Sequence, residues 1–434
     1  MYRQGLGDCF LISLPRTDGS GRPFYLMIDC GVVLGTPKPE EKMTEVMDHI
    51  VQTTGGEIDL LVATHEHWDH LSGFIQAKAS FDRLKIGQVW LAWTEDPENE
   101  LARQLKEKKA QAIAALRMGL AHMELAGDSD RATELSGILE FFGAAKGATT
   151  ADALKNVKAT VAAPRYCLPS DGPVVPSGTS AQFYILGPPP DAKWLRKINP
   201  STRDKETYGL TDDLRIFMDG AATALAESDT GRPFDRQYEI PFAVAQAAPE
   251  LQFFRDHYWQ PQAVAADDWR RIDGDWLDGA SDMALQLDSL TNNTSLVLAI
   301  ELAPDGDVLL FAADAQVGNW LSWQELKWTV GGKEVTGPDL LERAIFYKVG
   351  HHGSHNATLK DKGLEQMKNL RVAMIPVDHD MAVRKRWGKM PLEELVAALK
   401  KQASGGVLRA DQEMPDTREN VVEGPDRLFY EVTF

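Results

Sequence analysis

Residues 60–70 read LLVATHEHWDH, an apolar run that passes directly into three histidines, a glutamate and an aspartate. The apolar part is typical of a short buried strand. His65 and His67 are two residues apart, so in extended backbone their side chains leave the chain on the same face. Asp69 and His70 follow as the chain turns and can address a second ion a few ångströms away. A single histidine here would suit a solvated loop or a helix cap, but the cluster predicts a metal site.

Other short apolar runs, broken by turns, predict further strands on both sides of this segment. The turn-rich residues 16–23 separate the first two runs, which predicts a hairpin, and residues 304–306 (PDG) predict another turn. The predicted strands are residues 9–12, 24–28, 58–63, 295–300, 307–312, 344–349, 372–375 and 427–434, and the predicted helices are residues 41–51 and 392–401.

Two long stretches of different composition separate these strand-rich halves. The first, about residues 96–165, is rich in Ala, Leu, Glu and Lys at helical spacing and predicts several helices. The second, about residues 188–290, holds many of the tryptophans and prolines and predicts a helix over residues 212–226. We expect residues 1–434 to form a single domain that carries both as insertions. Both insertions could lie outside the active site and serve no direct function. Alternatively, since long insertions are often functional, the second one forms a lid over the active site.

The composition is that of an acidic globular protein. The 434 residues include 46 Lys+Arg and 64 Asp+Glu, so the formal net charge is −18. Such a surface disfavours binding to long nucleic acid, which depends on neutralising phosphates. The three cysteines fit no disulfide framework, and the chain shows neither a signal peptide nor an apolar run near the ~20 residues that cross a bilayer. These features predict a cytoplasmic protein that does not associate with membranes.

The pattern His65-x-His67-x-Asp69-His70 after an apolar strand resembles the signature of the metallo-β-lactamase superfamily. Three further landmarks of that family occur in order, and they are residues 28–31 (IDCG), 311–315 (FAADA) and 349–354 (VGHHGS). The resemblance implies a four-layer αββα sandwich of mixed α/β structure, in which two packed β-sheets have helices outside. It also implies one or two metal ions at the edge of the sandwich.

A closer resemblance is to the soluble metallo-hydrolase domain of ComEC-type competence proteins. It is carried by Gly5-x-Gly7-Asp8, by residues 293–298 (NTSLVL) and by residues 351–354 (HHGS). The similarity covers most of residues 1–95 and 290–380. This chain lacks the membrane channel of those proteins, so the resemblance does not imply transport.

The resemblance implies a ligand set for two ions that share one aspartate. The first ion would be held by His65, His67 and Asp314, and the second by Asp69, His70, Asp314 and one of His351 or His352. Asp69, His70 and Asp314 would form the catalytic group, while Asp8 and Asp29 would either fix histidine tautomers by hydrogen bonds or be ordinary turn aspartates.

The chain departs from many relatives at one ligand of the first ion. Relatives supply a further histidine from the middle of the chain, but the matching residues 184–189 here read YILGPP. His122 and His257 lie nearest in sequence, both within the insertions, and we expect structural roles for them. Imidazole and carboxylate ligands without thiolate suit two zinc ions and also tolerate manganese or iron. A hydroxide that bridges the two ions would be the nucleophile.

Polar residues in and after the late histidine motif are candidates for binding a substrate. A cationic run around Trp387, in a chain this acidic, could receive a phosphate or a base, although a solvated surface loop is the alternative. His355 and Asn356 could instead cap a helix that begins at Thr358. The candidate substrate-binding residues are Ser354, His355, Asn356, His379, Arg384, Lys385, Arg386 and Lys389.

Three functions remain open at the level of sequence. The first is a metal-dependent hydrolase acting on a phosphodiester or other phosphoester, in a nucleotide, a short oligonucleotide or a phosphorylated small molecule. The second is hydrolysis of a lactam, lactone or thioester by the same hydroxide. The third is a catalytically inactive, metal-stabilised binding module, which only the missing histidine favours. The sequence identifies no protein partner.

Overall fold

The computed structural model describes residues 1–126, 129–143, 148–197, 240, 244, 248–254, 279–385, 387, 390–414 and 420–434. The chain divides into two compact units. The first unit consists of Met1–Glu107, Glu140–Arg203 and Asp288–Phe434, and the second of Lys108–Leu139 and Asp204–Leu287. Every candidate site residue that the sequence singles out belongs to the first unit.

The first sheet has the order β1-β2-β3-β4-β5. Its strands are β1 (Cys9–Leu14), β2 (Phe24–Cys30), β3 (Glu57–Ala63), β4 (Lys85–Ala92) and β5 (Arg165–Cys167). β1 and β2 are antiparallel, which confirms the predicted hairpin, and β2 to β5 run parallel. The helices that pack on one face of this sheet are α1 (Pro39–Thr54), α3 (Gly73–Gln76), α4 (Lys78–Phe81) and α7 (Thr150–Lys158).

The second sheet has six strands in the order β13-β12-β11-β8-β7-β6. They are β6 (Gln182–Gly187), β7 (Val297–Glu301), β8 (Val308–Phe311), β11 (Ala344–Lys348), β12 (Val372–Ile375) and β13 (Gly406–Arg409). β7 runs antiparallel to its neighbours β6 and β8, whereas β8, β11, β12 and β13 run parallel. The helices on one face of this sheet are α13 (Val317–Trp323), α14 (Gly337–Glu342) and α16 (Glu393–Gln402). The described residues also contain two small antiparallel sheets of two strands each. One pairs β9 (Lys327–Val330) with β10 (Lys333–Thr336), and the other pairs β14 (Val421–Glu423) with β15 (Tyr430–Val432).

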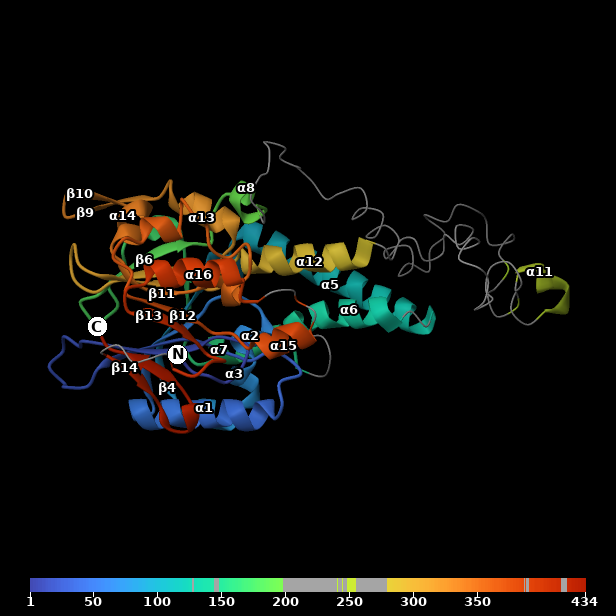
Figure 1. Cartoon of the computed structure of the whole chain (residues 1–434), viewed down its shortest axis with the longest axis horizontal. Helices are drawn as coiled ribbons and strands as arrows, with labels where there is room; N and C mark the ends of the chain where they lie inside the picture. The colour runs from blue at the N-terminus through green and yellow to red at the C-terminus, as the bar shows by residue number, and fades with distance from the viewer. Residues whose placement is uncertain are drawn as a thin grey trace. The chain divides into compact units, whose positions relative to one another are not determined.

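The buried strands explain why the sheets stack. In β3, Leu60 and Val62 point into a core that contains side chains from both sheets, while Leu61 and Ala63 point into the core beneath α1. This alternation follows from the two-residue period of a strand, and a strand buried on both faces is apolar throughout. The first unit therefore has the two sheets face to face, with helices on the outer face of each (Figure 1). The prediction of a mixed α/β protein is confirmed.

Chain segments at the ends of strands from the two sheets meet at one edge of the first unit. The backbone N–H of Leu296, just before β7, donates to the carbonyl of Thr64, just after β3, at 2.8 Å. The N–H of His351, after β11, donates to the carbonyl of Ala313, after β8, at 3.1 Å. These hydrogen bonds bring the polar residues after β3, β8 and β11 to the same place.

Most predicted elements are confirmed, and one expected helix is absent. α1, α16 and the other strands occur where the sequence predicts them, but the predicted strand over residues 427–434 is only β15 (Tyr430–Val432), after a 3-10 helix at Pro425–Arg427. α5 (Glu100–Ala126), α6 (Ser129–Leu139) and α7 occupy the first insertion. No helix begins at Thr358, so the expectation that His355 and Asn356 cap one is wrong; turns lead instead to a short 3-10 helix at Leu364–Gln366.

Several expectations fall outside the part of the chain that the structure describes. The predicted helix over residues 212–226 and most of the predicted lid are among them, as are His257 and the side chain of His122. Among the described helices, none is both long and apolar enough to cross a membrane.

Candidate metal centre

The histidine-rich segment follows β3 and continues into a short helix, α2 (Trp68–Leu71), which contains Asp69 and His70. His67 keeps an extended backbone immediately before α2, with φ −116° and ψ 155°. His65, His67, Asp69 and His70 are all buried in the first unit. Glu66 turns the other way and accepts a hydrogen bond from Thr150 Oγ1 at 3.0 Å, so it does not join the cluster.

Two glycines let three chain segments pack backbone against backbone at this segment. The N–H of Asp8 donates to the carbonyl of Asp69 at 3.0 Å, and the N–H of Gly31 donates to the carbonyl of Asp8 at 2.9 Å. A Cβ atom on Gly31 would lie 2.4 Å from the carbonyl carbon of Asp69. Gly7, with φ +149°, would place a Cβ 2.6 Å from the oxygen of the same carbonyl. The backbone of Asp69 and His70 is therefore held by contacts that only glycine permits.

Two imidazoles and two carboxylates converge from three places in the chain. His70 Nε2 lies 3.2 Å from Asp314 Oδ2, and His352 Nε2 lies 3.5 Å from the same oxygen. Asp69 Oδ2 lies 3.0 Å from His352 Nε2 and 4.0 Å from His70 Nε2. A tetrahedral zinc ion with bonds of 2.0–2.2 Å separates its ligand atoms by about 3.3–3.6 Å. These four atoms can hold one ion with only small movements.

This geometry distinguishes the two neighbouring histidines that the sequence leaves as alternatives. His352 directs Nε2 at the carboxylates, whereas His351 makes its closest hydrogen bonds through Nδ1 to Ser354 Oγ at 2.8 Å and through Nε2 to Asn292 Nδ2 at 3.4 Å. Both have left-handed backbone, with φ of 42° and 51°. Two consecutive non-glycine residues in this region are costly and persist where the surrounding structure requires them.

Hydrogen bonds on the far side of each ring select the tautomer that metal binding needs. His70 Nδ1–H donates to Asp29 Oδ2 at 2.7 Å, and His352 Nδ1–H donates to the carbonyl of Pro376 at 2.7 Å. Asp29 in turn accepts from the N–H and the hydroxyl of Thr64, at 2.8 and 2.6 Å. With the proton on Nδ1, the Nε2 lone pair of each neutral ring faces the carboxylates.

Lys348 is a member of the cluster that sequence reasoning missed. Its Nζ lies 2.6 Å from Asp8 Oδ2, 2.7 Å from the carbonyl of Ala313 and 3.2 Å from Asp314 Oδ1. Burial lowers the pKa of this amine, but the two carboxylates outweigh burial and raise it, so the side chain is cationic. The sequence does contain a signal for this residue: Lys348 is the last residue of the otherwise apolar strand β11, directly before the late histidine motif.

Asp8 contacts the residues around the proposed ion site but does not face the ion itself. One ligand atom from each of Asp8, His70, Asp314 and His352 fits within 4.8 Å of the others. Asp8, however, approaches the Nδ1 atoms, at 3.8 Å for His70 and 3.6 Å for His352, and its shortest contact is to Lys348. Its carboxylate therefore lies behind the two rings, on the side opposite the Nε2 atoms.

The carboxylates strongly affect the protonation of the rings. Burial lowers the pKa of His70, but Asp314, Asp8, Asp29 and Asp69 outweigh burial and raise it well above its usual value. The pKa of His352 is likewise raised, against burial, chiefly by Asp314 and Asp69. Burial raises the pKa of Asp314, yet His70, Lys348 and His352 bring it well below its usual value. The raised pKa values favour the protonated rings, so protons compete with an ion for His70 and His352.

We expect zinc binding to release protons from His70 and His352. Because their pKa values are raised, protons compete with the ion at lower pH, so zinc affinity should rise as pH rises. Calorimetric titrations at pH 6.5 and 8 in two buffers of different ionisation enthalpy measure both quantities. An affinity that is independent of pH, with no proton release, would contradict this protonation state.

His65 and His67 form a second pair of ring nitrogens next to this cluster. His65 Nε2 lies 3.1 Å from His67 Nδ1, and the ring centroids of His65 and His70 are 4.2 Å apart. Burial, together with the charges of His70 and His67, brings the pKa of His65 well below its usual value, so its ring is neutral. The pair fits two ligands of a first ion beside the four atoms described above.

The predicted substrate-binding residues are only partly brought together. Ser354 and Asn356 are buried, and Ser354 Oγ donates a hydrogen bond to Asn356 Oδ1 at 2.9 Å, whereas His355 is exposed. His379 is exposed at the start of α15 (His379–Arg384) and donates from Nδ1 to the carbonyl of Met390 at 2.9 Å.

The basic run after α15 has a structural partner. Lys385 forms an ion pair with Glu140, and Trp387 stacks on Phe141 with ring centroids 4.3 Å apart. Phe141 in turn lies 5.4 Å from the ring of His67. Lys385 is therefore engaged within the fold, and Arg384 is exposed. Arg386 and Lys389 lie outside the described residues.

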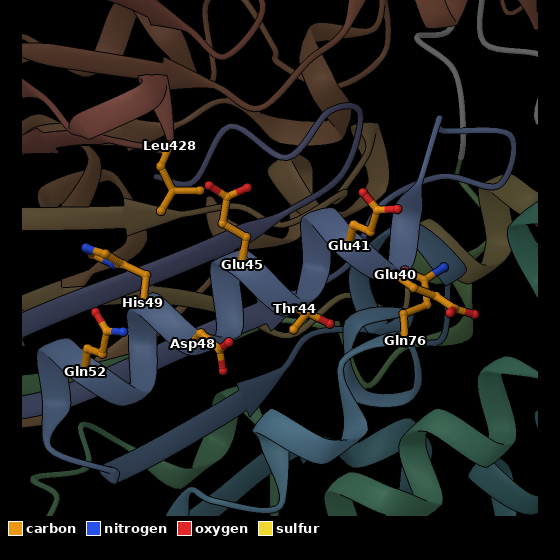
Figure 2. Close-up of a pocket in the computed structure, with 9 residues that line it drawn as sticks. All are labelled: Glu40, Glu41, Thr44, Glu45, Asp48, His49, Gln52, Gln76 and Leu428. Carbon is orange, nitrogen blue, oxygen red and sulfur yellow. The ribbon is translucent and has the colours of Figure 1, made fainter.

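A groove of about 750 Å³ lies elsewhere, along α1. Figure 2 shows that its lining includes Glu40, Glu41, Glu45 and Asp48, all from that helix. Its lining contains none of the converging histidines and aspartates. An anionic substrate would be repelled from this surface. The groove is therefore not the place to which the metal ligands point.

No protein-family model, curated protein or solved structure matches the chain.

Proposed function

We propose that this protein is a metal-dependent hydrolase of the metallo-β-lactamase type, with an αββα sandwich fold and two zinc ions. The observation that carries the proposal is that Nε2 of His70 and Nε2 of His352 each lie 3.0–4.0 Å from both Asp69 Oδ2 and Asp314 Oδ2. The His65–His67 pair beside them supports the second ion. Structural zinc sites are usually closed and rich in thiolate, whereas imidazole and carboxylate ligands are typical of catalytic sites.

Ions held there would polarise a substrate oxygen and lower the pKa of a bound water to near neutrality, which supplies the nucleophile. The residues of the chain do the rest. His70 and His352 keep a proton on Nδ1 through hydrogen bonds to Asp29 and to the carbonyl of Pro376, which directs Nε2 of each ring at the ion site. Lys348 holds Asp314 Oδ1, so that Oδ2 faces the rings. Because these groups are buried and fixed before substrate arrives, little reorganisation is needed during the reaction.

A phosphoester is the substrate class that we favour, and a phosphodiester in particular. Paired ions suit in-line displacement at phosphorus because they can bind both the attacking and the leaving oxygen. The exposed Arg384 can contribute a charge-assisted contact to a phosphate oxygen. The net charge of −18 favours a nucleotide, a short oligonucleotide or a phosphorylated small molecule over a long duplex.

The test is hydrolysis by zinc-loaded and manganese-loaded protein of bis-(p-nitrophenyl) phosphate, nitrocefin and a thioester panel. Turnover of the phosphodiester that is lost with chelator and restored by metal supports the proposal. Preference for nitrocefin or a thioester would move the assignment to carbon-centred bonds. Metal binding without turnover of any of these would favour a binding module.

Arg384→Ala should raise KM for the phosphoester about tenfold at low salt, with kcat little changed, since a charge-assisted contact from an exposed side chain contributes about 1.5 kcal/mol, the lower end of the usual range. The effect should shrink at high salt, because screening already weakens the contact in the native protein. Steady-state kinetics at two ionic strengths measure both effects. Lys400→Ala, which removes an exposed cation from α16, is the control. Unchanged KM in Arg384→Ala at both salt concentrations would show that this loop is a solvated surface.

A further inference from the structure

We propose that Asp288, near the end of α12 (Gly279–Asn292), is a positioning residue that sets the tautomer of His67 for the first metal ion. The inference rests on the proposed function. His65 and His67 are the two imidazoles placed to hold this ion, so the tautomer of each ring matters for its binding. Asp288 lies within an insertion and has no counterpart in the motifs that predict the site.

The first step is the orientation of the two rings. His65 Nε2 and His67 Nδ1 lie 3.1 Å apart, close to the separation of about 3.3 Å between two nitrogens that bind one zinc ion. His65 Nδ1 lies 3.0 Å from Thr64 Oγ1, whose hydroxyl proton is donated to Asp29 Oδ2 at 2.6 Å. The hydroxyl can therefore only accept from His65, which puts the His65 proton on Nδ1 and the lone pair on Nε2.

The second step is the proton of His67. A neutral imidazole carries one N–H, and for Nδ1 to bind an ion this proton must be on Nε2. Asp288 Oδ1 lies 3.7 Å from His67 Nε2. Both residues are buried, with exposed fractions of 1% for His67 and 8% for Asp288. A carboxylate this close, in surroundings of low dielectric, favours the Nε2–H tautomer and makes Nδ1 the better ligand.

The third step is the anchoring of the carboxylate itself. Asn292, one turn further along α12, donates from Nδ2 to Asp288 Oδ2 at 3.2 Å. The same amide nitrogen lies 3.4 Å from His351 Nε2. The last turn of α12 thus connects the two histidine motifs, and it leaves Asp288 Oδ1 directed at His67. Because Nδ1 and Nε2 face opposite sides of the ring, Asp288 acts through His67 and does not bind the ion held at Nδ1.

Two variants separate this role from a merely structural one. Asp288→Asn keeps the shape of the side chain and a neutral acceptor, whereas Asp288→Ala removes both. Loss of a carboxylate that orients a metal-binding histidine typically lowers metal affinity 10–100-fold. We expect one of the two zinc ions to lose affinity by about this factor in Asp288→Ala and less in Asp288→Asn, with the other ion unchanged. Ser289→Ala, the next residue on α12, is the control and should bind both ions as the wild type does.

The experiment is a chelator-competition titration of zinc, combined with long-range ¹H–¹⁵N spectra of ¹⁵N-histidine-labelled protein. In the wild type we expect the His67 ring to bind zinc through Nδ1 with its proton on Nε2. Binding through Nε2, equal affinities in all variants, or weakening of both ions by the same factor would overturn the inference, as would a wild type with no zinc at the His65–His67 pair. Neither readout involves turnover, so absence of hydrolysis would count against the proposed function alone.

Discussion

Asp314→Asn is expected to lower phosphodiester hydrolysis by on the order of 1000-fold, whereas Asp8→Asn should lower it by about 10–100-fold. Asp314 places Oδ2 within 3.5 Å of two metal-facing ring nitrogens, so its loss removes a ligand. A metal ion supplies several kcal/mol of transition-state stabilisation, and each 1.36 kcal/mol corresponds to about tenfold in rate. Asp8 lies behind the rings and contacts Lys348, so its loss disturbs ligands without removing one.

Rates and metal content of the two variants should be measured together. Both substitutions preserve side-chain shape, and each removes one carboxylate from Lys348, so they are matched in the charge they take from the cluster. We expect Asp314→Asn to retain less zinc than Asp8→Asn after dialysis against a weak chelator. Equal losses of activity, or a greater loss in Asp8→Asn, would show that the ligand role is assigned to the wrong aspartate.

Gly31→Ala is expected to lower the free energy of unfolding by about 3 kcal/mol and to weaken zinc binding at the same time. A methyl group here would lie 2.4 Å from the carbonyl carbon of Asp69 and 2.5 Å from the N atom of His70, so the backbone that carries two ligands must move. Overpacking against backbone is more costly than against a flexible side chain, because backbone cannot adopt another rotamer.

Urea unfolding and zinc titration of Gly31→Ala provide the check, with Gly137→Ala as the matched control. Gly137 lies in α6, where an added Cβ meets nothing within 4 Å and the backbone is not left-handed. The control should be neutral or stabilised by up to about 1 kcal/mol, as expected for glycine to alanine in a helix. A Gly31→Ala protein as stable as the control would mean that these segments separate easily.

The strands and the main cluster could be predicted because their signals are local or recur as motifs. The apolar run before His65 predicts β3, and successive side chains of that strand enter two different cores, which explains why both of its faces are apolar. Asp69, His70 and Asp314 each follow a strand of one sheet or the other, and the structure brings them together. The choice between His351 and His352 was not predictable, because it depends on two left-handed residues whose ring directions no spacing rule gives.

Other parts of the site depend on contacts between distant residues that carry no pattern of their own. Asp288 is one of several acids in an insertion, and only the fold places it near His67. Lys385 looked available to a phosphate, yet Glu140, 245 positions away, pairs with it. A charge run in sequence shows how many cations are present but not which of them already have partners inside the fold.

The order in which the ligands occur along the chain determines when the site can assemble during synthesis. His65, His67, Asp69 and His70 all come from the first sheet, but His352, which lies 3.0 Å from Asp69, is 283 positions later. At about 5–20 residues per second, a ribosome needs roughly 15–55 s to make the intervening chain. During that time the growing polypeptide contains the ligands that follow β3 but not those of the second sheet. At the proposed zinc site, the ligand set is therefore complete only after the second sheet has been synthesised.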